Sequence, residues 1–164
     1  KNLFLNKWCI IIKEKKQNSK KINLLKKFWK KIGSKVVLMN PVNHDKIFSI
    51  TSHLPHLIAY NLIKTAQDSQ KIQRKNLIQY SAGGLRDFSR IAASNEIMWR
   101  DIFFSNDNII KAINLFIKNL NSFKKIIQNK NNKKLLSRLS NSKKVRTQIV
   151  KLKQDIAKPD FGRE

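Results

Sequence analysis

The 164-residue chain is long enough for one domain of ordinary size, or for one domain and part of a second. Its single cysteine, Cys9, excludes an intramolecular disulfide, and no apolar run reaches the roughly 18 residues of a membrane span. These features predict a soluble, cytoplasmic protein without a membrane partner, and the opening at Lys1, with no signal-like apolar core, resembles a cut through a longer protein.

The net charge of +25 is typical of proteins that bind phosphate groups, but its distribution argues against that function. Residues 44–107 carry 8 basic and 6 acidic side chains, so only the two flanks are strongly basic. Lysine outnumbers arginine by 28 to 7, although recognition of bases and phosphates favours arginine. We therefore predict no nucleic-acid partner, and a basic helical module that binds nucleic acid or anionic surfaces is the alternative.

Residues 1–40 show the order strand, helix, strand. Short apolar runs at 8–12 and 35–39 predict two strands, the first of them buried. The helix between them is predicted from apolar residues three and four apart and ends at Gly33, in a C-cap position. This order predicts a βαβ piece of a parallel α/β sheet, and two strands are too few to form a domain.

From residue 41 onward the pattern is helical. Asn40 is a suitable N-cap and Pro41 a suitable first helical residue for a helix that runs toward Thr65. Pro55 lies inside this helix and should kink it, because proline lacks a backbone N–H. We therefore predict two domains, residues 1–40 and residues 41–164.

The remainder of the second domain is predicted as a series of helices. Residues 67–76 are polar and predict a loop or a frayed helix, and two short helices follow, the second capped by Ser94. Asn106 and Asp107 open an amphipathic helix, and a basic helix should follow it. The residues predicted to point inward from the amphipathic helix are Ile110, Ile113, Phe116 or Ile117, Leu120, Phe123 and Ile127. Those of the last helix are Leu135, Leu139, Val145, Ile149, Leu152 and Ile156.

Two histidines in the motif SHLPH, His53 and His56, lie three residues apart and so on one face of a helix. That spacing could supply half of a metal site, but no carboxylate or thiol stands at ligand spacing nearby, and we predict no metal. Two hydrogen-bonded core histidines are the plainer interpretation.

The motif SAGGLRDFSRIAAS places Arg86, Asp87 and Arg90 on one helical turn among small residues. A surface salt-bridge cluster is the plainer interpretation, and a glycine pair such as Gly83 and Gly84 is most often a turn. Small residues also let a ligand or a second helix approach the backbone, and an arginine there can bind a carboxylate with two parallel hydrogen bonds. Trp99, in the motif MWRDIF, is more often a core residue than a substrate contact.

The order HDKIFSITSHLPHLIAYNL, SAGGLRDFSRIAASNEIMWRDIFFSN resembles the C-terminal part of the prephenate dehydrogenases, whose broad-specificity members are the cyclohexadienyl dehydrogenases. The resemblance runs from about Leu3 to the helix near Ile127, and the tail, Ala157 to Arg163, is similar to that of alphaproteobacterial members. The resemblance implies a mainly α fold. The last βαβ piece of a Rossmann domain comes first, and the all-helical dimerisation domain of a 6-phosphogluconate-dehydrogenase-like enzyme follows it.

The function that the resemblance implies is NAD- or NADP-dependent oxidative decarboxylation of prephenate or arogenate in tyrosine biosynthesis, by a homodimer. Arg90 would hold a substrate carboxylate, His56 would hydrogen-bond the substrate side chain, and Trp99 would line the pocket. Gly83 and Gly84 would allow close approach to the substrate, whereas Asp87 would lie at the subunit interface and His53 behind the pocket. The catalytic histidine and most cofactor contacts are expected upstream of Lys1, so the chain alone should be inactive.

Two further alternatives share this fold. A related dehydrogenase could act on a different hydroxy acid, although the pairing of SHLPH with DFSRIAAS speaks against that. A dimerisation remnant could have kept the fold and lost the chemistry, and the presence of His56, Arg90 and Trp99 argues against this alternative.

Overall fold

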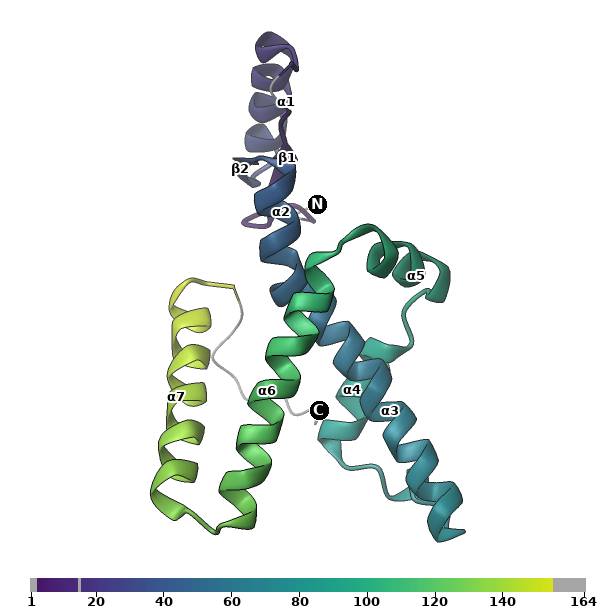
Figure 1. Cartoon of the computed structure of the whole chain (residues 1–164). Helices are drawn as coiled ribbons and strands as arrows, with labels where there is room; N and C mark the ends of the chain where they lie inside the picture. The colour runs from purple at the N-terminus through teal and green to yellow at the C-terminus, as the bar shows by residue number, and fades with distance from the viewer. Residues whose placement is uncertain (1–2, 15, 155–164) are drawn as a thin grey trace. The chain divides into compact units, whose positions relative to one another are not determined.

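The computed structural model describes residues 3–14 and 16–154, which form two compact units, residues 1–53 and residues 54–164. Figure 1 shows the elements of both. The first unit contains β1 (Trp8–Ile12), α1 (Ser19–Lys31), β2 (Lys35–Met39), α2 (Pro41–Phe48) and the π-helical turn η1 (Ser49–His53). The second contains α3 (Leu54–Gln73), the short 3-10 helix η2 (Ile78–Tyr80), α4 (Gly83–Ala92), α5 (Glu96–Ser105), α6 (Asn108–Gln128) and α7 (Asn132–Lys151). The predicted mainly α fold with an initial βαβ piece is confirmed, and the division into domains at residues 40 and 41 stays a prediction.

The two predicted strands pair in parallel, in register from Trp8 opposite Lys35 to Ile12 opposite Met39. Helix α1 connects them, and the side chain of Asn18 caps its first turn. Gly33 follows the helix with φ of +92°, a conformation that glycine adopts without strain. A Cβ atom at Gly33 would lie 2.8 Å from Leu5 Cδ1 and 3.3 Å from Leu5 Cα, so Leu5 would have to shift to accept it. The βαβ prediction is confirmed.

The helix that begins at Pro41 is interrupted before Pro55. Asn40 caps it as predicted, its side chain accepting a hydrogen bond of 2.8 Å from the backbone N–H of Asn43. The α-helical pattern then gives way to η1 and resumes in α3. Pro55 has no N–H to donate to the carbonyl of Thr51, so the ladder is disturbed where the π turn lies.

Helix α3 continues to Gln73, so of the two alternatives predicted for residues 67–76 the loop is wrong for residues 67–73. Lys64 and Asp68 form an ion pair of 2.6 Å, four residues apart, which favours the helix although the segment is polar. Arg74, with φ of 50°, ends it.

Helices α4 and α5 are the two predicted short helices. The predicted cap at Ser94 is wrong by one residue, because the Asn95 side chain accepts the backbone N–H of Met98 at 2.8 Å. The Ser94 hydroxyl instead donates to the carbonyl of Ile91 at 2.7 Å, at the end of α4. Ser94 thus lies in the connection after α4, and Asn95 is the N-cap of α5.

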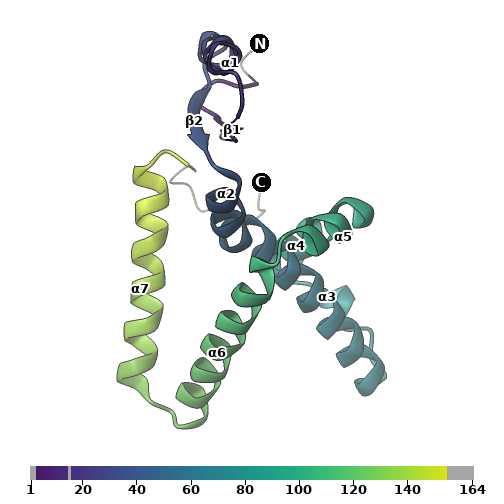
Figure 2. The same cartoon turned by 45° about the horizontal axis from the view of Figure 1, so that its top comes forward.

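Helices α6 and α7 are antiparallel neighbours joined by a short turn (Figures 1 and 2). The side chain of Arg138, on α7, bonds the Ser122 hydroxyl and the Asn119 carbonyl of α6, both at 3.2 Å, and lies over the Phe123 ring. The predicted last helix is confirmed as far as Lys151, with Leu152 as its C-cap. Its predicted inward face is wrong, because Leu139, Val145, Ile149 and Leu152 are exposed in the single chain and only Leu135 is half-buried. The predicted inward residue Ile156 lies outside the described residues.

The buried face of α6 differs from the predicted one. The buried residues of this helix are Ile109 and Ala112. Three residues predicted to point inward are instead exposed, namely Ile110, Leu120 and Ile127. Of the alternatives Phe116 and Ile117, Phe116 is half-buried and Ile117 is exposed. Ile110, Ile117 and Leu120 lie at helical spacings of seven and three residues, and we call this stripe the α6 outer face. The prediction failed here because α6 is apolar on more than one face.

The cores of the two units are small. Only Ile11 in the first unit, and Ala59, Trp99, Ile109 and Ala112 in the second, are buried apolar residues within the described part of the chain. No helix among the described residues combines the length and the apolar character needed to cross a membrane.

Candidate functional site

His56 and Trp99 are in direct contact. His56 lies in the first turn of α3 and Trp99 in the first turn of α5, 43 positions later. Their rings are stacked, with centroids 3.8 Å apart and planes inclined by 23°. Trp99 is only 5% exposed, and Phe103, one turn further along α5, packs on it at 5.4 Å. The structure therefore brings together two of the predicted site residues.

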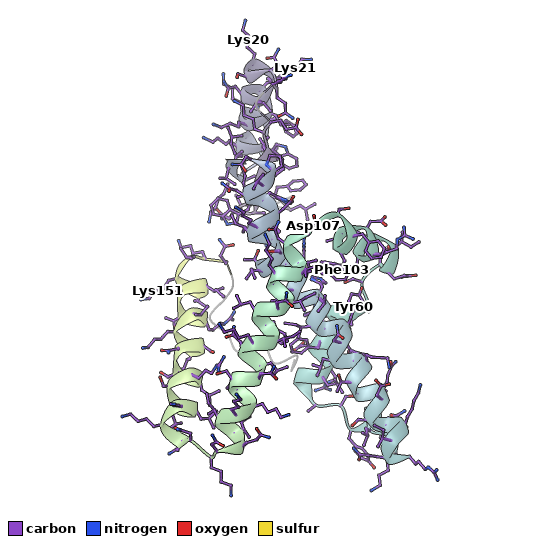
Figure 3. All side chains as sticks on the ribbon, viewed as in Figure 1. Lys20, Lys21, Tyr60, Phe103, Asp107 and Lys151 are labelled. Atoms are coloured by element: carbon purple, nitrogen blue, oxygen red, sulfur yellow. The ribbon has the colours of Figure 1, made fainter. Side chains whose placement is uncertain are left out.

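A hydrogen bond that the sequence did not predict lies beside this pair. The hydroxyl of Tyr60 donates to the backbone carbonyl of Ser94 at 3.1 Å and joins α3 to the connection between α4 and α5. Tyr60 lies four residues after His56 and therefore on the same side of α3. Figure 3 labels Tyr60 on α3 and Phe103 on α5. The four-residue spacing from His56 could have drawn attention to Tyr60, but it does not predict which residue the Tyr60 hydroxyl bonds.

Arg90 lies on the exposed side of α4. The larger half-buried apolar residues of this helix are Leu85, Phe88 and Ile91, and α4 packs along α3. Arg86 and Arg90 are both exposed. Neither arginine forms a hydrogen bond or ion pair through its side chain with any residue that the structure describes. The guanidinium of Arg90 is thus available to an external carboxylate.

Asp87 is half-buried on the same helix, and its carboxylate pairs with neither arginine among the described residues. The salt-bridge cluster considered as the plainer interpretation is therefore not formed within this part of the chain. The predicted place of Asp87 at a subunit interface stays a prediction.

The glycine pair opens α4, with Gly83 as its first residue. A Cβ atom added at Gly84 would have no atom of the described chain within 4 Å, apart from its own helix backbone and neighbours. Packing within the chain thus does not require glycine at Gly84. Close approach of a substrate or a second chain at Gly83 and Gly84 stays a prediction.

His53 is half-buried in the last position of the π turn η1, in the first unit, and its predicted place behind the pocket stays a prediction. Over the described residues, no three side chains of histidine, cysteine, aspartate or glutamate are grouped so that they could hold a metal ion.

Residues 40–141 match the protein family described as "Prephenate dehydrogenase, dimerization domain". The chain belongs to this family. It is 36% identical over 120 residues to a cyclohexadienyl dehydrogenase of Zymomonas mobilis, a match that covers 73% of this chain and 41% of that protein. It is 29% identical over 160 residues to a prephenate dehydrogenase of Bacillus subtilis, covering 97% of this chain and 43% of that protein.

The fold of this family member is also that of a solved prephenate dehydrogenase. The enzyme from Aquifex aeolicus, crystallised in complex with hydroxyphenyl propionate and NAD+, superimposes with a TM-score of 0.81 and 38% identity. The match covers 90% of this chain and 52% of that one. The chain thus spans about half the length of the relatives it matches. The predicted family is confirmed, whereas the roles of the individual site residues stay predictions.

Proposed function

We propose that this chain forms the substrate-binding and dimerisation part of a prephenate or arogenate dehydrogenase, an enzyme of tyrosine biosynthesis that performs NAD- or NADP-dependent oxidative decarboxylation. The observation that carries the proposal is the guanidinium of Arg90, which is exposed on α4 and has no partner among the described residues of a chain that belongs to the prephenate dehydrogenase family. Prephenate and arogenate are both carboxylates, and a free guanidinium is the side chain best suited to bind such a group.

The proposed roles follow the chemistry of each side chain. Arg90 would bind a substrate carboxylate through two parallel hydrogen bonds. His56 would hydrogen-bond the substrate side chain through an edge of its ring, because its nitrogens lie in the ring plane and Trp99 covers a ring face. Gly84 would admit the substrate or a neighbouring chain close to the start of α4.

The described βαβ piece does not supply the phosphate-binding turn of a nicotinamide cofactor. The connection from β1 to α1 contains no glycine, so it lacks the glycine-rich turn that binds a pyrophosphate at the start of a Rossmann helix. We therefore assign no pyrophosphate contact to this connection. Cofactor contacts, and the choice between NAD and NADP, would belong to a nucleotide-binding domain outside it.

The proposed homodimer is supported by the α6 outer face. Ile110, Ile117 and Leu120 leave about half or more of their surface exposed in the single chain. A contiguous apolar stripe on a soluble protein commonly marks an interface. The family to which residues 40–141 belong is named for dimerization, so a second copy of the chain is the proposed occupant.

The test is a kinetic assay on this chain joined to its nucleotide-binding domain. NADH or NADPH formation would be followed with prephenate and with arogenate, in the parent enzyme and in Arg90→Ala. Removing a charged pair of hydrogen bonds costs about 3 kcal/mol, so kcat/KM should fall by roughly a hundredfold. Arg74→Ala, which removes another exposed arginine of the same unit, is the matched control and should leave kcat/KM unchanged.

Two results would contradict the proposal. An intact enzyme that binds the cofactor but oxidises neither substrate would remove the function and leave the basic module as the alternative. Equal kcat/KM for Arg90→Ala and Arg74→Ala would remove Arg90 from the site.

A further inference from the structure

We propose that Trp99 and Tyr60 are positioning residues for His56, and that Trp99 acts through the stacked imidazole rather than by touching the substrate. The inference rests on the proposed function, because it assumes that His56 contacts the substrate. It revises the expectation that Trp99 lines the substrate pocket.

The stacking geometry suits the orientation of an imidazole. At 3.8 Å between centroids and 23° between planes, the indole lies flat against His56 and opposes rotation of the imidazole about its Cβ–Cγ bond. The ring nitrogens donate and accept hydrogen bonds in the plane of the ring, so stacking does not occupy them. Trp99 can therefore fix the direction of the hydrogen bond that His56 would make to a substrate.

The burial of Trp99 argues against direct substrate contact. With 5% of its surface exposed, it offers little open area in the described structure. Its ring already packs on His56 and on Phe103. His56 is half-buried, so its imidazole is more accessible than the indole of Trp99.

Tyr60 supplies a second attachment between the same segments. Its hydroxyl holds the Ser94 carbonyl at 3.1 Å, five residues before Trp99, and Tyr60 itself lies one helical turn after His56. A single contact between α3 and α5 would let the indole pivot over the imidazole. Two contacts one turn apart restrict that movement, and the next residue, Asn95, caps α5 and fixes the direction in which the helix leaves.

A double-mutant cycle in the complete dehydrogenase separates positioning from direct contact. We expect Trp99→Leu to lower kcat/KM about tenfold when His56 is present, and by less than about twofold in a His56→Ala background, because the two residues act as a unit. If Trp99 touches the substrate, the same loss will occur in both backgrounds, which would overturn the proposal. Trp99→Phe keeps a stacking ring and should restore most of the activity.

Tyr60→Phe provides a variant that keeps the ring and its packing and therefore should fold. It removes one hydroxyl, and we expect a severalfold loss of kcat/KM that disappears in the His56→Ala background. The matched control is Tyr80→Phe, at the other tyrosine of the chain, which is 78% exposed in η2. An equal effect of both substitutions, or a Tyr60→Phe loss that persists without His56, would refute the role of Tyr60.

Nuclear magnetic resonance of the His56 ring distinguishes failure of this inference from failure of the proposed function. Tyr60→Phe should shift the imidazole proton signals, since the indole that lies over them would move, whereas Tyr80→Phe should not. Unchanged signals in Tyr60→Phe would refute positioning by Tyr60 even in an enzyme that oxidises prephenate. Shifted signals in a protein that oxidises neither substrate would support positioning while the proposed reaction fails.

Discussion

Replacing Ile117 by aspartate is expected to dissociate the proposed dimer. Ile117 lies in the middle of the α6 outer face and is 48% exposed in the single chain. Burying the remaining half of an isoleucine side chain contributes about 1 kcal/mol, and a twofold interface contains the residue twice, so about 2 kcal/mol is lost. Burying two unpaired carboxylates costs several kcal/mol more, and the dissociation constant should rise by a factor of about a thousand or more.

The assay is sedimentation velocity over a dilution series of the complete protein. Lys118→Asp is the matched control, because it places the same side chain on the same helix, about 100° around the axis from Ile117. The control changes the charge by one unit more than Ile117→Asp does, so a general charge effect would be larger in the control. If Ile117→Asp remains a dimer at the concentrations at which the parent does, the α6 outer face is not the interface.

Three stability predictions can be checked by urea or thermal unfolding. Asn40→Ala removes the cap bond to the Asn43 N–H and should cost about 1 kcal/mol; no change would mean that another group satisfies that donor. Gly33→Ala should cost more than about 1 kcal/mol, because φ is +92° and the new Cβ would collide with Leu5, and a stable variant would refute that packing. Gly84→Ala should leave stability equal or raise it by up to about 1 kcal/mol, and a simultaneous loss of activity or dimerisation would place a ligand or partner at this position.

The local elements of this fold could be predicted because short-range signals decide them. The run of β-branched residues at 8–12, the cap at Asn40 and the glycine at Gly33 act on their own neighbours in the chain. The segment 67–73 was missed because its polarity suggested a loop, although the ion pair between Lys64 and Asp68 is compatible with a helix. Polarity reports exposure, and an exposed helix is as polar as a loop.

The candidate site could be predicted in part. The motifs SHLPH, SAGGLRDFSRIAAS and MWRDIF drew attention to His56, Arg90 and Trp99. The stacking of His56 on Trp99 could not be predicted from them, because it joins residues 43 positions apart. The bond from Tyr60 to the Ser94 carbonyl was missed for a further reason, since any residue type can supply a backbone acceptor and no sequence pattern marks it.

Periodicity, caps and long motifs are properties of neighbouring residues, and they were enough to predict the helical order of the chain, its βαβ beginning and the family to which it belongs. Which apolar stripe of α6 faces the core depends on how the helices pack. Ile109 and Ala112 are buried within the chain, whereas Ile110, Ile117 and Leu120 remain exposed. One side of α6 packs against its own chain, and another side is proposed to meet a second copy. Both sides of the helix are therefore apolar. Periodicity cannot separate two such faces, because burial within a subunit and burial between subunits place the same demand on the side chain.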